Sequence, residues 1–202
     1  MVEEQAGAAD HGISFSLKLR RPFRAAFLTM FRFLVIFVAS LLILFTLDVL
    51  TVVEVHFVDP FNALLASLSA KLIGLFGGDA VAQGKIIISI STGLAVSIER
   101  VCNGIEAVII LVSAMIAFPA RILHKLIGIV LGTLAIQALN LVRIISLYYL
   151  HQWDSVWFEW FHSYIWQALI VLDALVMFLL WLRYLPRPAA TIVQPPKAEA
   201  PT

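Results

Sequence analysis

The stretch Phe33–Val53, FLVIFVASLLILFTLDVLTVV, decides the class of this protein. A transmembrane helix needs about 20 consecutive, mainly apolar residues to cross roughly 30 Å of hydrocarbon, and this stretch is long enough. It is too long for the apolar region of a signal peptide, and no small-residue cleavage site ends it. We therefore predict a first transmembrane helix over Phe31–Val53.

The composition of the whole chain agrees with a membrane protein. Of its 202 residues, 61% are hydrophobic and 13% are charged, whereas soluble domains are typically about half apolar and a quarter charged. The net charge of +1 gives no indication of a nucleic-acid partner, and we expect none. The single cysteine excludes an internal disulfide and any metal site built from several cysteines.

Three further apolar stretches predict three more membrane helices. They cover Ile105–Phe118, which ends before Pro119, Leu126–Leu150 and Tyr164–Tyr184. The predicted fold class is therefore an all-α integral membrane bundle of about four transmembrane helices. The 13 residues at 151–163, HQWDSVWFEWFHS, are predicted to be a short interfacial connection because they are rich in Trp and Phe.

Basic residues predict the orientation of these helices. They gather before the first helix, between the second and third helices, and after the fourth; they are Lys18, Arg20, Arg21, Arg24, Arg32, Arg121, Lys125, Arg183 and Arg187. Short cytoplasmic loops collect Lys and Arg, so both termini are expected in the cytoplasm of a bacterium, with the protein in its inner membrane. The expected domains are a basic cytoplasmic segment over 1–29, a membrane domain over 30–185 and a disordered cytoplasmic tail over 186–202.

The segment 54–100 is expected on the outer, periplasmic side and carries two weaker patterns. From Asp59-Pro60, a favourable helix start, apolar residues recur every three or four positions, which predicts an amphipathic helix on the membrane surface. Residues 86–99 alternate with a period of two on both sides of Thr92-Gly93, which indicates a short β-hairpin. An irregular loop is the alternative for these residues.

Three reactive side chains fall at similar depth under this topology. Cys102 lies at the outer end of the second helix, Arg143 about 10 Å below the outer end of the third, and His162 at the outer start of the fourth. A nucleophilic cysteine needs a nearby cation or base, and an acyl-transfer intermediate needs donors for its oxyanion. An arginine within a span costs at least about 2.5–3.5 kcal/mol at the bilayer centre, which favours a function for Arg143.

Each of these side chains also has a structural interpretation. Cys102 can be a small packing residue, Arg143 can pair with Asp173 or Glu106, and His162 can be an interfacial histidine. His151 and His56 are alternatives to His162 on the same side. Supporting roles are possible for further neighbours: Asn140, one turn before Arg143, can hold the guanidinium; Glu106 can orient a partner or cap its helix; Arg100 is a second cation near the thiol.

The motifs that contain these residues resemble the exosortases and archaeosortases, which are integral-membrane cysteine transpeptidases. The shared pattern is Cys-x-Gly at the start of a membrane helix, here Cys102-Asn103-Gly104, then Asn-x-x-Arg, here Asn140 to Arg143, and a histidine at the start of the last helix, here His162. The resemblance covers about residues 30 to 185. Many members have Ser or Thr after the cysteine, whereas this chain has Asn103. This departure, followed by Ile105-Glu106, and a short chain with fewer spans than larger members look like the compact bacterial subgroup called exosortase H. The targets of that subgroup end in an IPTLxxWG-type signal.

The resemblance implies a function and a substrate class. The substrates would be membrane-anchored proteins whose C-terminal sorting signal combines a recognition motif, a transmembrane helix and a basic cluster. Cys102 would attack the scissile carbonyl to form a thioester, Arg143 would stabilise the thiolate or oxyanion, and His162 would transfer protons. We also expect the 54–100 segment to form a lid or recognition shelf over this site.

Two other classes of protein compete with this interpretation. A non-enzymatic membrane scaffold or assembly subunit would use Arg143 and Asp173 as contacts between helices. A small transporter subunit is disfavoured by the few intramembrane charges and by the lack of an internal repeat. The sequence shows no metal-ligand spacing and no glycine-rich phosphate loop, so we expect no cofactor.

Overall fold

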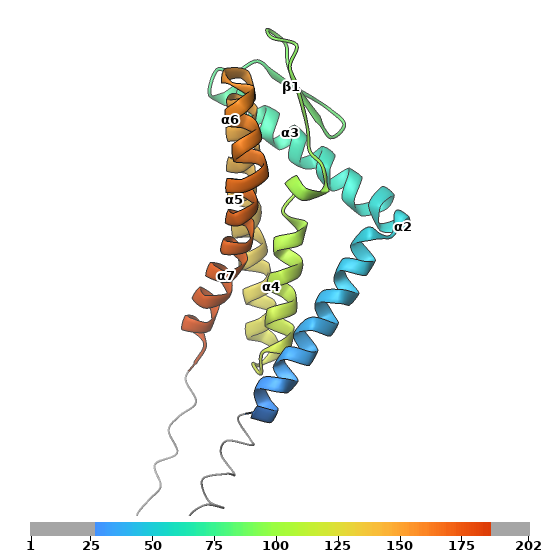
Figure 1. The fold of residues 1–202 in the computed structure, drawn as a ribbon, viewed down its shortest axis with the longest axis vertical. Helices are drawn as coiled ribbons and strands as arrows, with labels where there is room; N and C mark the ends of the chain where they lie inside the picture. The colour runs from blue at the N-terminus through green and yellow to red at the C-terminus, as the bar shows by residue number, and fades with distance from the viewer. Residues whose placement is uncertain (1–26, 187–202) are drawn as a thin grey trace, which may run out of the picture.

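The computed structural model describes residues 27–186. The predicted basic segment over 1–29 and the predicted tail over 186–202 lie almost entirely outside the described residues. Within 27–186 the chain forms a group of long helices, with a further helix and a small sheet at one end (Figure 1).

Three helices in the described part of the chain are long and apolar enough to cross a membrane: Phe27–Val49, Ile122–Trp153 and Val156–Tyr184. The predicted second span is α4, Ile105–Ala117, whose 13 residues cover only about 20 Å at 1.5 Å per residue. Four full spans are therefore not observed. Pro119 explains the short α4, because a proline disfavours helical backbone in the residue before it, and Phe118 is extended.

The predicted connection over 151–163 is helical instead. Helix α5, Ile122–Trp153, is followed almost at once by α6 (Ser155–Trp160), the π-helix η3 (Phe161–Ile165) and α7 (Trp166–Tyr184). Only Asp154 separates α5 from α6, and its carboxylate accepts hydrogen bonds from the backbone N–H groups of Val156 and Trp157, which caps the new helix. This helical hairpin is longer than a bilayer core, so its aromatic end extends beyond the hydrocarbon.

The first long helix ends at Val49, earlier than the predicted Val53, and the chain bends at Leu50. The short α2 (Thr51–Val53) and the π-helix η1 (Glu54–Val58) lead into α3 (Asp59–Leu75), which lies across the end of the bundle (Figure 1). The helix predicted from Asp59-Pro60 is thus confirmed. Its buried face is formed by Asn62, Leu65, Ala66, Ser69, Ala70 and Ile73.

A three-stranded antiparallel sheet follows α3, with the order β1-β2-β3. Its strands are β1 (Ala80–Gln83), β2 (Ile86–Ser89) and β3 (Ala95–Ser97). The predicted hairpin is confirmed by the pairing of β2 with β3, in which Ile87 opposes Val96. Strand β1 was not predicted, because its Ala-rich sequence carries little β-propensity.

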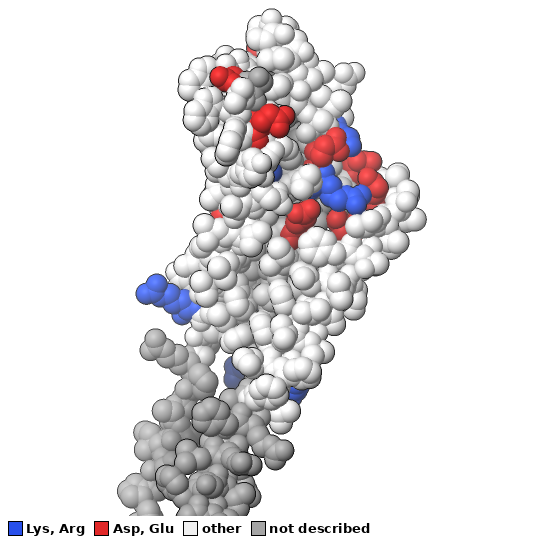
Figure 2. Space-filling model, in the orientation of Figure 1, with Lys and Arg blue, Asp and Glu red and all other residues white. Residues whose placement is uncertain are grey.

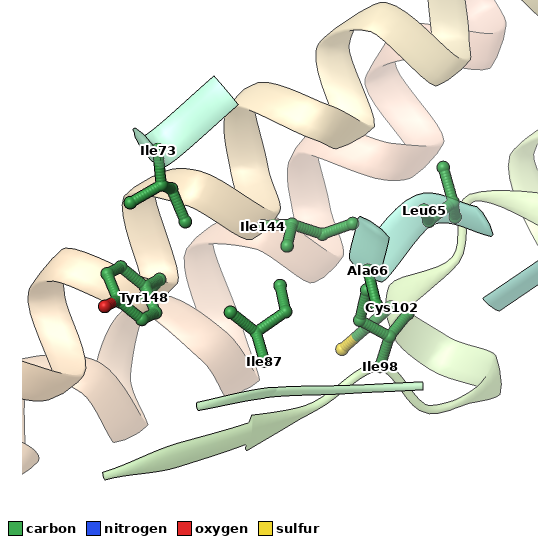
Figure 3. Close-up of a cluster of buried hydrophobic side chains, with 8 residues drawn as sticks. All are labelled: Leu65, Ala66, Ile73, Ile87, Ile98, Cys102, Ile144 and Tyr148. Carbon is green, nitrogen blue, oxygen red and sulfur yellow. The ribbon is translucent and has the colours of Figure 1, made fainter. Parts of the chain in front are cut away.

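A buried cluster joins the sheet, α3 and α5. Figure 3 shows its eight side chains, which are Leu65, Ala66 and Ile73 from α3, Ile87 and Ile98 from the sheet region, Ile144 and Tyr148 from α5, and Cys102. The lone sulfur therefore lies where three elements meet rather than on a lipid-facing surface.

Charged side chains gather near α3 and the sheet, whereas the visible surface of the helical part is mostly uncharged (Figure 2). The start of the first helix and the end of α7 lie together at the opposite end of the molecule (Figure 1). This arrangement agrees with helices that cross a membrane from one side and come back to that same side.

Candidate active site

Cys102 ends a one-turn 3₁₀ helix, η2 (Arg100–Cys102), between the sheet and α4. Its backbone N–H donates to the carbonyl of Glu99 at 2.8 Å, which fixes the turn. The side chain is 6% exposed. The cysteine is therefore held on a short, hydrogen-bonded connection between the sheet and the first turn of α4.

The next two residues bring α4 close to its neighbours. Gly104 has φ +75°, and a Cβ there would lie 3.1 Å from Nε2 of Gln137 and 3.2 Å from Cγ of Asn140, so glycine satisfies both the backbone and the space. Asn103 is fully buried; its Oδ1 accepts from the N–H of Ile105 at 2.9 Å, and its Nδ2 donates to Oδ1 of Asn62 at 3.0 Å. These contacts start α4 and attach the turn to α3.

Two nitrogen-bearing side chains lie beside the sulfur. Nη2 of Arg143, on α5, is 3.8 Å from Sγ of Cys102 and in position to donate to it. Nδ1 of His162, on η3, is also 3.8 Å from Sγ. The arginine is only 2% exposed. The structure thus brings together the three side chains that the sequence predicted to share one depth.

The electrostatic state of the thiol differs from the simplest expectation for a reactive cysteine. Burial raises the pKa of Cys102, and the positive charge of Arg143 opposes this effect only in part. The resting side chain is therefore a neutral thiol at pH 7, since its ordinary pKa is already about 8.5. Nucleophilic attack requires that a base remove its proton, and His162 is the nearest titratable side chain with a hydrogen-bonding contact to the sulfur.

Asn140 does not hold the guanidinium as the sequence suggested. It is buried beside Gly104, and both its amide oxygen and its amide nitrogen lack hydrogen-bond partners in the described part of the chain. Nε and Nη1 of Arg143 also lack partners there. Asn140 and Arg143 instead line one small cavity of about 10 Å³ together with Trp166 and Asp173. Unpaired N–H groups of a buried cation remain available for an anionic acceptor.

The other predicted supporting charges are placed differently. Arg100 forms an ion pair with Glu54 on η1, at 3.0 Å between Nη2 and Oε1. This ion pair attaches the turn that contains Cys102 to η1, and Arg100 is directed to Glu54 rather than to the thiol. Glu106 lies in the first turn of α4. Asp173 forms no ion pair with Arg143 within residues 27–186.

A cleft of about 280 Å³ gives access to the thiol. One wall is β3 and the residues that follow it, and the other wall belongs to α5, α6 and η3; the lining includes Ser97, Glu99, Cys102, Leu147, His151, Phe158 and His162. A larger cavity, of about 380 Å³, lies between α5 and α7 around Gly128 and Trp181 and is almost entirely apolar. Of these two spaces, the smaller cleft is the one that combines a nucleophile with a base.

Comparison with known families adds one decisive observation. The sequence matches the family described as Transmembrane exosortase (Exosortase_EpsH) over residues 18–182, which includes Cys102, Arg143 and His162. The chain belongs to the transmembrane exosortase family. No curated protein and no solved structure matches it. Family membership supports a transmembrane transpeptidase role in general terms.

The exosortase site also contains residues that the motifs did not indicate. The ring of Phe158 stacks on His162 with centroids 5.5 Å apart and an interplanar angle of 8°. It also contacts the ring of His151, at 4.6 Å between centroids. The two histidines therefore share one aromatic partner and one cleft. Asn62, the partner of Asn103, was also missed. Its polar position on the buried face of α3 was the only available signal.

Proposed function

We propose that this exosortase is a cysteine transpeptidase that cleaves C-terminal sorting signals of exported proteins and transfers or releases the product. The observation that supports this proposal is the pair of 3.8 Å contacts from Arg143 and His162 to one buried sulfur at an open cleft. A scaffold needs neither contact, and within residues 27–186 Arg143 forms no ion pair between helices that would favour such a role.

The first half-reaction forms a thioester. Nδ1 of His162 accepts the proton of the Cys102 thiol as sulfur attacks the scissile carbonyl carbon, and the carbonyl π electrons move to oxygen. The guanidinium of Arg143 donates hydrogen bonds to this oxyanion and attracts its charge. When the oxyanion collapses, the carbon–nitrogen bond breaks, and His162 returns its proton to the leaving amine.

The second half-reaction resolves the thioester. An amine or water from the envelope attacks the same carbonyl carbon while His162 accepts its proton. The tetrahedral intermediate again places its negative oxygen beside Arg143. Collapse expels the Cys102 thiolate, which takes back the proton, so one histidine serves as base and acid in both steps.

The proposed location is the inner membrane of a bacterium, with both termini cytoplasmic and the cleft facing the periplasm. This orientation is supported by Arg32, Arg121, Lys125 and Arg183, which belong to the end opposite the cleft and follow the positive-inside rule. Substrates would be membrane-anchored proteins with a motif, a transmembrane helix and a basic cluster. Signals of the IPTLxxWG type, expected for exosortase H, are the first to test.

The test uses co-expression with a tagged reporter that ends in such a signal. Cys102→Ala should abolish processing of the reporter, and mass spectrometry of the wild-type protein should detect an acyl adduct on Cys102. His162→Ala should reduce processing by about 10²–10⁴-fold, as expected for loss of a general acid–base group. His56→Ala is the matched control, because His56 lies on η1 and does not line this cleft. His151→Ala distinguishes the two histidines of the cleft.

The outcomes separate the competing interpretations. Unchanged processing by the Cys102→Ala protein would exclude the thioester mechanism and favour the scaffold. Loss of processing in the His151 variant alone would show that His151, and not His162, transfers the protons.

A further inference from the structure

Strand β3 is an edge strand, and its outer edge borders the cleft. The sheet order β1-β2-β3 leaves β3 paired on one side only. Ala95, Val96 and Ser97, which make up β3, all line the cleft that contains Cys102. Edge strands with unpaired backbone groups are ready templates for another extended chain, so the polar groups on this edge are of interest.

The backbone hydrogen bonds between β2 and β3 show which groups face outward. The carbonyl of Leu94 accepts from the N–H of Ser89, and the N–H of Ile98 donates to the carbonyl of Lys85, both at 2.9 Å. The carbonyl of Leu94 and the N–H of Ile98 therefore point toward β2. Because peptide groups alternate along a strand, the N–H and C=O groups of Ala95 and Ser97 point away from β2. They have no hydrogen-bond partner in the described part of the chain.

The side chains on this strand leave its edge accessible. Val96 and Ile98 lie on one face of the strand, where Ile98 is 1% exposed and Val96 is half-buried, while Ala95 and Ser97 are exposed and small. Across the cleft stand Leu147, His151 and Phe158 from the helical hairpin. The space between them is a slot with backbone donors and acceptors on one wall and aromatic and aliphatic side chains on the other, and the thiol lies within it.

We propose that the peptide to be cleaved binds by strand addition to β3. Its backbone pairs with the N–H and C=O groups of Ala95 and Ser97, which directs the scissile carbonyl toward Cys102. Main-chain hydrogen bonds supply affinity in this mode of recognition, and alternate side chains of the peptide enter the opposite wall for specificity. This inference rests on the proposed function, because it assigns the recognition step of the same site.

A carboxylate at the end of β3 adds a charge preference. Glu99 accepts from Oγ of Ser97 at 2.7 Å and from Nζ of Lys85 at 3.1 Å. These hydrogen bonds, that of Ser97 first, lower the pKa of Glu99, so the group is negative at neutral pH. Acidic residues in the part of the peptide that passes this rim should therefore weaken binding.

The first test measures binding without turnover. The purified Cys102→Ala protein in detergent micelles is mixed with a synthetic peptide that contains the Ile-Pro-Thr-Leu motif, and amide hydrogen exchange is followed for segments that contain β1 and β3. Strand addition should slow exchange in the β3 segment and leave β1 unchanged. Binding without added protection in β3 would overturn the proposal, as would failure of the peptide to bind at all.

A matched pair of variants tests the backbone contact itself. Ala95→Pro removes an outward N–H but leaves the β2–β3 hydrogen bonds intact, because proline is tolerated on edge strands. Ala95→Val adds a side chain of similar size and keeps the N–H. We expect Ala95→Pro to weaken peptide binding about 3- to 10-fold, the effect of one or more lost hydrogen bonds, and Ala95→Val to change it less than about 2-fold. Equal affinities would refute strand addition.

N-methylation of the peptide gives a test that leaves the protein unaltered. A paired strand loses affinity when alternate amides are methylated, and the proline of the motif, which has no N–H, must belong to the unpaired set. Methylation at Thr should therefore weaken binding, whereas methylation at Leu should not. Tolerance at both positions would contradict the proposal. A protein that binds with this alternation but leaves the reporter uncut would instead show that the transpeptidase proposal, not the recognition mode, is wrong.

Discussion

The substitution Arg143→Gln tests whether the buried guanidinium controls the reactivity of the thiol. Glutamine is shorter than arginine, but it keeps a polar side chain with N–H donors and removes the positive charge. The side chain of Arg143 contacts the sulfur of Cys102 and has no ion-pair partner within residues 27–186. Loss of a buried charge without a partner carries little stability cost, so we expect the fold to survive and the chemistry to change.

The size of the effect follows from the distance between the charges. At 3.8 Å from Nη2 to Sγ, the attraction between a guanidinium and a thiolate is about 4 kcal/mol with an effective dielectric constant of about 20. This energy favours the thiolate by up to about 10³-fold. Without Arg143 the thiolate is less populated, but each thiolate is a stronger nucleophile because nucleophilicity rises with the pKa of the thiol, with a Brønsted coefficient of about 0.4–0.5. This second effect offsets part of the first. The expected loss of reaction rate with a disulfide reagent at fixed pH is therefore about 30-fold.

The measurement is simple because the chain has one cysteine. The purified protein in detergent is reacted with dithiodipyridine at pH 8, and the release of thiopyridone gives the rate at Cys102 alone. Arg183→Gln is the control, because it makes the same change on an exposed arginine at the opposite end. Arg143→Lys should react at an intermediate rate. A folded Arg143→Gln protein that reacts as fast as the wild type would refute the electrostatic argument.

Three further predictions follow from the site and the sheet. Because burial raises the pKa of Cys102, its reaction rate with dithiodipyridine should keep rising from pH 6 into the alkaline range, and a plateau below pH 7 would contradict this. Gly104→Ala should destabilise the protein by about 1–3 kcal/mol in detergent unfolding, because it places a Cβ at φ +75° against Asn140; a stability equal to wild type would show that the turn relaxes freely. Hydrogen bonds, those from Ser91 first, lower the pKa of Asp79 to about 2, so their contribution is complete above about pH 4 and is lost as pH falls toward 2; Asp79→Asn should remove this acid dependence of exchange in β2.

The candidate site could be predicted because chemistry and membrane topology both constrain it. A single cysteine, an arginine in an apolar helix and a histidine at a helix end are rare enough to be noticed one by one. The topology then placed them at one depth, and the structure shows two 3.8 Å contacts to the sulfur. Asn103 and Gly104 were noticed only as parts of a motif; their roles in capping α4 and in the close approach of α5 needed coordinates.

The errors of the sequence analysis have physical causes. Asp154 signals a helix cap as well as a loop, and a period of 3.6 in an aromatic-rich stretch is easily hidden by the interfacial composition of residues 151–163. The length of α4 depended on Pro119, whose effect was recognised, but a 13-residue helix was counted as a span. Asn140 was expected to bind Arg143 because they share a helical face, whereas the approach of Gly104 from another element decides its surroundings.

A neutral resting thiol suits the proposed position on the periplasmic side. Oxidants and disulfides react with the thiolate rather than the thiol, and a bacterial periplasm is kept oxidising. Burial of Cys102 therefore protects the only cysteine while the site is empty. Arg143 and His162 lie at the same distance from the sulfur, and together they supply the opposite charge and the base when a carbonyl arrives. If the peptide enters by pairing with β3, it reaches Cys102 through the cleft that Cys102 and His162 both line, so the thiol is activated where the substrate is positioned.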